Sequence, residues 1–187
     1  MNFIPIFPLS IVVFPEEELN LHIFEPRYRQ LINDCHTQNK GFGIPVVINN
    51  EMKELGTLMK IKKIVKVYEN GDMDIITQGQ KVFRILEPIP EIPDKLYKGA
   101  IVHYYHNTHN GRAQLMKKVL DSVRLLHQML NVKKDFNKDD ADIQSYDVAH
   151  HAGLSLEQEY EILGYTDELH RQEYLKRHLS KNIPIIS

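Results

Sequence analysis

The sequence contains a single cysteine, Cys35, and no uninterrupted apolar run long enough to cross a membrane. One thiol excludes both an internal disulfide and a cysteine-rich zinc site. A membrane-spanning helix needs about 18–20 consecutive apolar residues, so none is expected. The N-terminal run MNFIPIFPLSIVVF has no basic start, is interrupted by prolines and is followed by EEE, so we do not expect a signal peptide. These features favour a reduced, cytoplasmic setting.

An excess of charge of one sign is also missing. Lys and Arg total 23 against 25 Asp and Glu, a net charge of −2. No overall electrostatic field therefore attracts nucleic acid or an anionic membrane. The 187 residues contain no G-x-x-x-x-G-K-[ST] phosphate loop, the motif that cradles ATP. We expect no cofactor and no membrane partner.

The stretch LHIFEPRYRQLI, residues 21–32, joins a predicted strand to a predicted helix. Alternating apolar residues favour a strand as far as Phe24. Proline suits the first position of a helix, where its missing N–H has no partner to lose, so the helix is predicted to start at Pro26. Its apolar residues recur three and four apart, which predicts one buried stripe of Tyr28, Leu31, Ile32 and Cys35.

Further strands are predicted as far as about residue 105. Pro45 indicates an edge strand or an irregularity. The Asn70-Gly71 pair predicts a hairpin with a two-residue turn, because both residues tolerate positive φ. Gly79 within the returning strand predicts a bulge or a bend.

The second half of the chain is predicted to be helical. Apolar spacing predicts a helix with a buried stripe of Leu115, Val119, Val123, Leu126 and Leu130. Ser145 and Thr166 are predicted helix caps, and Ser155 with Gln158 forms a predicted capping box. The boundary is expected in NTHNG, residues 107–111, which gives a β-rich part of residues 1–108 and a helical part of residues 109–187.

Glu25, Pro26 and Arg27 place a carboxylate and a guanidinium on either side of a proline. A catalytic carboxylate needs a second acid, base or nucleophile within reach, and His22 is the nearest candidate. A carboxylate at the start of a helix also meets the positive end of the helix dipole. We interpret the three residues as a structural junction between strand and helix, in which Glu25 pairs with Arg27, Arg29 or a distant arginine such as Arg84.

The assembled motifs resemble the N-terminal substrate-binding domain of the ATP-dependent Lon proteases. The resemblance rests on Phe7-Pro8-Leu9, Phe14-Pro15 and the run from Leu21 to Tyr28. GTLMKIKKI, NGDMDIITQGQKVFRI and LSLEQEYEILGYTDELHRQEYL follow in the family's order. Ser10 and Glu16 stand where the family commonly has glycine, and no segment resembles the family's protease domain with its serine–lysine dyad.

The resemblance implies an α+β fold, with a PUA-like β pseudobarrel followed by a C-terminal α-helical bundle. It also implies a free-standing, non-catalytic module that binds exposed apolar segments of unfolded or partly folded polypeptides, as an adaptor for a protease or chaperone. Phenylalanines are concentrated in the first quarter of the chain, and an open apolar groove among them would receive extended polypeptide. The candidate binding residues are Phe7, Phe14, Phe24 and Tyr28.

Other constellations have a structural interpretation beside a functional one. His103, His106 and His109 would need to converge to bind a metal, but neighbouring strand positions alternate in direction. No metal site is therefore predicted. The sequence leaves open whether a metal or a small ligand binds near these histidines. Lys118 and Ser122 lie one helical turn apart, but no oxyanion hole accompanies them. A hydrolase of unknown type is therefore the weakest class.

An RNA-binding PUA-like protein is the alternative to a polypeptide-binding module. The predicted hairpin carries basic residues that could contact phosphates, although few aromatic residues accompany them for stacking on bases. With a net charge of −2, nucleic acid is the less favoured partner. The sequence leaves the oligomeric state open. The basic residues are Lys60, Lys62, Lys63, Lys66, Lys81 and Arg84.

Overall fold

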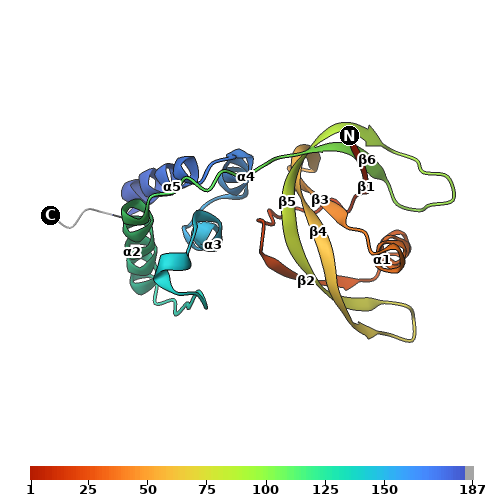
Figure 1. Ribbon diagram of the computed structural model, residues 1–187. Helices are drawn as coiled ribbons and strands as arrows, with labels where there is room; N and C mark the ends of the chain where they lie inside the picture. Colours follow the sequence, from red (N-terminus) through yellow and green to blue (C-terminus); the bar gives the residue numbers. More distant parts are fainter. Residues whose placement is uncertain (184–187) are drawn as a thin grey trace. The chain divides into compact units, whose positions relative to one another are not determined.

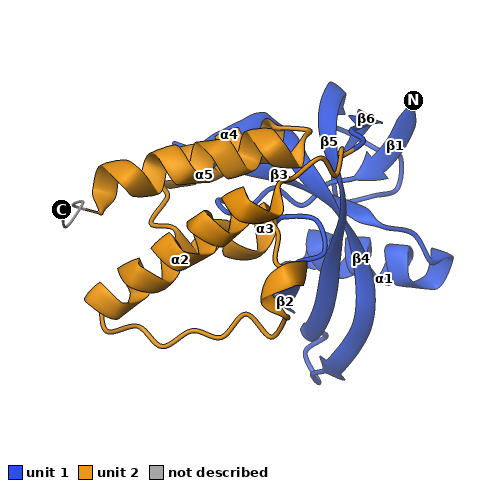
Figure 2. Ribbon diagram, turned by 60° about the vertical axis from the view of Figure 1, so that its left-hand side comes forward, with its two compact units in different colours: residues 1–106 blue, residues 107–187 orange. Residues whose placement is uncertain are grey.

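The computed structural model of this protein describes residues 1–183. The chain divides into two compact units, with the division between His106 and Asn107. Figure 2 colours the two units separately. Unit 1 contains the strands and helix α1 (Pro26–Gln38), whereas the described part of unit 2 contains helices and no strand. The predicted combination of an antiparallel, β-rich part with helices is therefore confirmed.

Unit 1 is built on a six-stranded antiparallel sheet with the order β1-β6-β5-β4-β3 (Figure 1). Strand β5 pairs with β2 through its first half and with β6 through its second half, so this long strand joins two parts of the sheet. The bounds are β1 Asn2–Pro5, β2 Glu18–Ile23, β3 Phe42–Ile48, β4 Glu51–Val67, β5 Met73–Ile89 and β6 Gly99–Tyr104.

The segment that follows β1 lies along the outer edge of β3. The Phe7 amide donates to the carbonyl of Gly43 at 2.8 Å, the Leu9 amide donates to Pro45 at 3.2 Å, and the Val47 amide donates back to Leu9 at 2.9 Å. Because β1 pairs with β6 at the other end of the strand order, one continuous stretch of chain links the two outer strands. Pro45 stands where the β3–β4 register shifts, which confirms the predicted irregularity.

Helix α1 begins at Pro26, as predicted, with the proline in its first turn. All four residues of its predicted stripe are buried and join the main core cluster of unit 1. The helix ends at Gln38, and the next residue, Asn39, adopts a left-handed conformation with φ of 51°. Asparagine tolerates this conformation better than other residues with a side chain, so the helix stops before Gly41.

The predicted hairpin of β4 and β5 is present, but its turn differs from the prediction. The Tyr68 amide donates to the carbonyl of Asp72, and the Gly71 amide donates to that of Tyr68, both at 2.9 Å. The predicted two-residue turn needs a positive φ at both Asn70 and Gly71. Of these two residues only Gly71 has a positive φ, of 90°. The Asn70 side chain instead accepts a hydrogen bond from the Asp72 amide, which favours the longer loop.

Gly79 lies at a bulge, as predicted, because the pairing of β5 with β4 skips Gln80. A Cβ atom on Gly79 would lie 2.3 Å from the carbonyl oxygen of Phe14. The backbone of Phe14 therefore approaches β5 more closely than a residue with a Cβ atom at position 79 would allow.

Unit 2 contains α2 (Ala113–Met129) and α5 (Glu168–Asn182), which lie side by side, together with α3 (Ser145–Val148) and α4 (Leu156–Gly164) (Figure 1). Two short 3-10 turns cover Asp140–Asp142 and Ala149–His151. Among residues 1–183, no helix is both long and apolar enough to traverse a bilayer.

The buried stripe of α2 follows the prediction only in its first three turns. Leu126 is half-buried and Leu130 is 63% exposed, so the prediction is wrong at these two positions. His127 takes the buried place one turn after Val123, because its Nε2 lies 3.1 Å from the carbonyl oxygen of His151. A buried imidazole needs such a partner, and apolar periodicity does not reveal it.

The helix caps of unit 2 are partly as predicted. The Gln158 amide donates to Ser155 Oγ at 3.2 Å, and the Ser155 amide donates to Gln158 Oε1 at 2.9 Å, which confirms the capping box. Helix α5 is capped by Asp167, whose carboxylate accepts from the His170 amide at 2.8 Å, so the prediction of Thr166 is wrong by one residue. Both types are good caps, and the sequence alone does not choose between neighbours.

Ser145 was predicted to cap α3, but this prediction is wrong by one residue, because Gln144 is the N-cap. Ser145 is the first residue of the helix. Its hydroxyl is fully buried and donates to Glu168 Oε2 at 2.6 Å, and its amide donates to Glu168 Oε1 at 2.8 Å. The serine therefore ties α3 to the first turn of α5.

Candidate functional site

At the start of α1, Glu25 and Arg27 form an ion pair with each other. Arg27 donates to one oxygen of Glu25, from Nε at 3.0 Å and from Nη2 at 2.9 Å. The Glu25 side chain makes no hydrogen bond to the helix backbone, although its carbonyl accepts from the Tyr28 and Arg29 amides. Of the partners considered for Glu25, the local Arg27 is therefore the one that the structure provides.

His22, the histidine nearest to Glu25 in sequence, pairs elsewhere. Its Nδ1 lies 2.7 Å from the Asp74 carboxylate, which also accepts from the Tyr68 hydroxyl at 2.6 Å. These two contacts, led by that of Tyr68, lower the pKa of Asp74. These contacts join His22 to the β4–β5 hairpin rather than to the Glu25 carboxylate.

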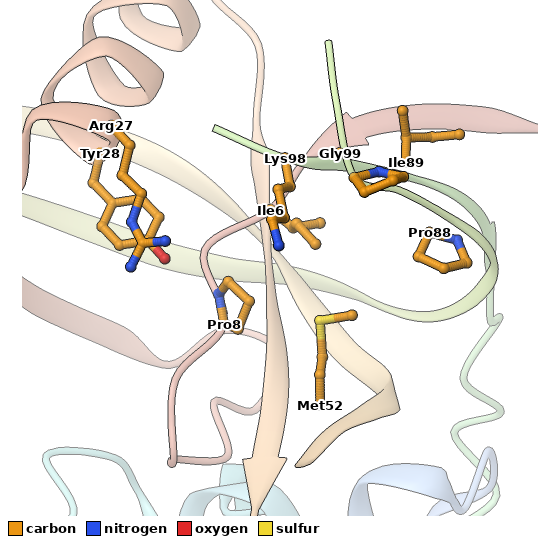
Figure 3. A pocket seen from close by; sticks show the side chains of 10 residues that line it. Ile6, Pro8, Arg27, Tyr28, Met52, Pro88, Ile89, Lys98 and Gly99 are labelled. Carbon is orange, nitrogen blue, oxygen red and sulfur yellow. The ribbon is translucent and has the colours of Figure 1, made fainter. Parts of the chain in front are cut away.

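Beside the junction, unit 1 holds a pocket of about 430 Å³, a size within the range of about 300–1,000 Å³ that ligand sites span. Figure 3 shows Arg27 and Tyr28 at one end, Met52, Pro88 and Ile89 at the other, and Lys98 between them. The remaining lining residues are Ile6, Pro8, Pro90 and Gly99.

Three of the lining residues are prolines, at positions 8, 88 and 90. Proline has no backbone N–H, so it presents an apolar ring and cannot donate to the backbone of a bound chain. A guest would therefore be held at these positions by its side chains rather than by added strand pairing.

Tyr28 forms a rigid wall of the pocket. Its ring stacks on Phe7 with the centroids 3.8 Å apart, and Arg27 covers it with the guanidinium carbon 4.7 Å from the ring centre. Burial raises the pKa of Tyr28, an effect that the charge of Arg27 partly opposes. The side chain is therefore a neutral phenol at physiological pH.

The pocket carries positive charge without a matching acid in its lining. Arg27 and Lys98 are both exposed and both line the pocket, and no lining residue is acidic. Arg27 is partly neutralised by Glu25, whereas Lys98 Nζ has no ion-pair partner among residues 1–183. The charge available to a guest is therefore close to a single positive unit.

The structure places the four candidate binding residues in different environments. Tyr28 lines the pocket and Phe7 stacks against the Tyr28 ring, with 8% exposed surface each. Phe14 is completely buried, so its ring presents no surface to a ligand, and Phe24 is 60% exposed with its ring centre 6.2 Å from that of His22. Their binding roles stay predictions.

Sequence reasoning missed Met52, Lys98 and the prolines of the pocket. The proline-rich stretch EPIPEIPD, residues 87–94, supplies Pro88 and Pro90. Its density of rigid apolar rings is the one local signal that could have indicated a binding wall.

The basic hairpin is paired in part with acidic side chains. Lys62 Nζ lies 3.1 Å from Glu18, and Arg84 Nε lies 3.0 Å from Glu54. Lys66 lies over the Tyr68 ring, 4.3 Å from its centre. Each carboxylate beside a cation reduces the positive potential that a phosphate backbone would meet.

No three His, Cys, Asp or Glu side chains of the described chain are grouped so that they could hold a metal ion. His103 is exposed on β6 and its ring packs against Tyr105, with the centroids 6.0 Å apart.

Comparison with solved structures shows the fold of a Lon N-terminal domain. The crystal structure of a Lon N-terminal domain protein from Xanthomonas campestris is similar over 94% of this chain and 97% of that chain, with a TM-score of 0.71 and 22% identity. The N-terminal domain of the Lon protease of the Mycobacterium avium complex is similar over 97% and 100% of the two chains, with a TM-score of 0.66 and 14% identity.

Sequence comparison identifies the family. The Lon protease of Flavobacterium johnsoniae is 30% identical over 99 residues, which are 48% of this chain but only 12% of that protein. The model of the ATP-dependent protease La (LON) substrate-binding domain matches residues 4–181. The chain therefore belongs to the LON substrate-binding domain family, which confirms the resemblance seen in the sequence.

Proposed function

We propose that this protein binds exposed apolar segments of unfolded or partly folded polypeptides and performs no reaction on them. The observation that carries the proposal is the apolar pocket of unit 1, in a chain whose family is named for substrate binding. The proposal includes a role as an adaptor that delivers captured chains to a protease or chaperone.

The pocket supports weak and broad recognition. Burying one large apolar side chain contributes about 1.5–3 kcal/mol, and binding also costs the ordering of the captured segment. A single pocket of this size therefore suits a dissociation constant on the order of micromolar or weaker. Such an affinity allows many different chains to be sampled and released.

We also propose a finer description of the fold, with a PUA-like pseudobarrel in unit 1 and a helical bundle in unit 2. The link that residues 6–9 make between β1 and the edge of β3 supports a PUA-like pseudobarrel for unit 1. The packing of α2 against α5 supports a helical bundle for unit 2. We keep residues 1–108 and 109–187 as the proposed domains, close to the division between His106 and Asn107.

Titration at two salt concentrations tests polypeptide binding against RNA binding. Burial of apolar surface responds little to moderate salt, so affinity for a labelled, reduced and alkylated polypeptide should change less than about threefold between ~50 and ~200 mM salt. RNA held through four phosphates would weaken roughly fifty-fold over that range. Salt-sensitive binding of mixed single-stranded RNA, without polypeptide binding, would replace the proposal with the RNA-binding alternative.

A matched pair of variants assigns polypeptide binding to the pocket. Met52→Asp places a charge at the apolar end and should weaken binding at least about fivefold, because the carboxylate would lose water on contact with an apolar guest. Val65→Asp is the control, since Val65 lies on the same strand, is 52% exposed and does not line the pocket. Equal affinities for the two variants would remove the pocket from the proposal.

A further inference from the structure

We propose that the pocket selects extended segments in which an acidic side chain lies two positions away from a large apolar one. This inference rests on the proposed function and narrows its substrate class. It follows from the arrangement of the lining, which has a cationic part at Arg27 and Lys98 and an apolar part at Met52, Pro88 and Ile89 (Figure 3).

The positive charge is available to a guest. Lys98 is exposed, lines the pocket and has no ion-pair partner in the described part of the chain. Arg27 directs Nε and Nη2 to Glu25 and keeps the same planar group fixed over the Tyr28 ring. Its Nη1 has no carboxylate partner among residues 1–183, so a guanidinium edge that is already oriented can donate to an incoming anion.

The number of charges favours a carboxylate over a phosphate. Two cations and the neighbouring Glu25 carboxylate leave about one net positive charge in the cationic part of the pocket. One carboxylate balances that charge, whereas a phosphate monoester near pH 7 carries about −1.5 to −2 charges, exceeds that balance and is repelled by Glu25 more strongly than a carboxylate is. The chemistry therefore matches aspartate or glutamate rather than a phosphorylated residue.

An extended chain can present two of its side chains to the pocket at once. Side chains two positions apart in an extended polypeptide point in the same direction, roughly 6.5–7 Å apart. An acidic residue at one position then reaches the cations while an apolar residue two positions away reaches Met52 and Ile89. The prolines that line the pocket accept apolar contact but donate no backbone hydrogen bond, so selection falls on these two side chains.

A charge exchange between peptide and protein tests the inference. Short labelled peptides, blocked at both ends, carry a leucine with glutamate, glutamine or lysine two positions away in a polar background. The wild-type protein should bind the glutamate peptide about two- to fivefold more tightly than the glutamine peptide, the size expected of exposed ion pairs, and the lysine peptide most weakly. Fluorescence anisotropy at low salt measures all three affinities.

The protein variants are Lys98→Glu and, as control, Lys63→Glu. Lys98→Glu should reverse the order, so that the lysine peptide binds most tightly, whereas Lys63→Glu should preserve the wild-type order because Lys63 is exposed on β4 outside the pocket. Both substitutions lie at exposed positions, and circular dichroism spectra matching that of the wild type verify folding. Equal affinity of the wild type for the glutamate and glutamine peptides would overturn the inference, as would an unchanged order in Lys98→Glu.

Three further outcomes show whether this inference, the proposed function or both have failed. A glutamine peptide with a free C-terminal carboxylate that binds more tightly than the blocked glutamate peptide would show that the cations read a chain end, and would overturn the inference. Binding of all blocked peptides with equal affinity, weakened by Met52→Asp, would overturn the charge selection and support the proposed function. Binding of neither the peptides nor the unfolded polypeptide would overturn both.

Discussion

Arg171 is buried as deeply as the leucines around it, with 1% of its surface exposed. Its Nη2 donates to Glu168 at 3.0 Å, its Nε donates to Ser145 at 2.9 Å, and its Nη1 donates to the Tyr165 carbonyl at 2.6 Å. The guanidinium also lies 4.1 Å from the centre of the Tyr146 ring. Every nitrogen of this buried cation therefore has a partner, as the cost of a buried charge requires.

Removal of that cation should be among the most damaging single changes in unit 2. Arg171→Ala leaves the Glu168 carboxylate buried without its counter-charge, so the free energy of unfolding should fall by about 3–5 kcal/mol. Urea denaturation followed by circular dichroism measures the change. Lys176→Ala, at an exposed position of the same helix, is the control and should alter stability by less than about 0.5 kcal/mol. A loss below about 1 kcal/mol for Arg171→Ala would contradict the buried pair.

Between elements, the polar face of α1 holds the connector from β5 to β6 in place. Asp34 accepts from Lys95 Nζ and from the Tyr97 hydroxyl, both at 2.7 Å. One turn earlier, Gln30 Oε1 accepts from the Leu96 amide at 2.7 Å. Because Pro90 and Lys98 of the same connector line the pocket, helix α1 positions that wall as well as supplying Arg27 and Tyr28.

Loss of the Asp34 charge should weaken this contact in a pH-dependent way. The Lys95 ammonium first, and the Tyr97 hydroxyl second, lower the pKa of Asp34. A lowered pKa in the folded state gives stability that is present above the unfolded pKa of about 3.9 and is lost as the pH falls through the folded value. Asp34→Asn should therefore cost about 1 kcal/mol at pH 7 and progressively less below about pH 4.

Unfolding by urea at several pH values measures this dependence. Asp94→Asn is the matched control, because Asp94 is exposed in the same connector and its positive φ suits asparagine equally well. A difference between wild type and Asp34→Asn that stays constant from pH 7 to about pH 3 would show that the carboxylate charge does not hold the connector.

At the level of elements, the sequence predicted what local chemistry determines. Pro26 marked the start of α1, and Ser155 with Gln158 marked the start of α4, because each motif satisfies the backbone of its own helix. Features decided by distant contacts were missed. The buried His127 has its partner in the carbonyl of His151, and the Ser145 hydroxyl binds Glu168 instead of capping α3.

Across the whole molecule, the pocket illustrates the same limit. Its lining comes from five separate stretches of sequence, around residues 6–8, 27–28, 52, 88–90 and 98–99. The sequence indicated two of them, through the Phe7-Pro8-Leu9 motif and through the charged pair beside Pro26, because each is visible locally. The others become neighbours through the pairing of β1 with β6 and the path of the connector, which periodicity does not specify.

A molecule that recognises chains without altering them should show no turnover of its own. The 187 residues contain no phosphate loop, so ATP has no cradle of the usual kind. The single thiol is a poor nucleophile, because burial raises the pKa of Cys35 to about 12 and leaves very little thiolate near neutrality. Ser122 and Lys118 lie along α2, where a hydroxyl ordinarily bonds to its own helix.

We therefore expect the purified protein to release no phosphate from ATP above a blank and to leave an unfolded, casein-like substrate uncut, even when that substrate is bound. Malachite-green detection of phosphate and gel analysis of the substrate over several hours measure the two activities. A Ser122→Ala preparation, purified in parallel, is the control for contaminating enzymes, since a contaminant would persist in both preparations. Activity that is present in the wild type and lost in Ser122→Ala would show that the helix carries a nucleophile, and the binding-only account would then be wrong.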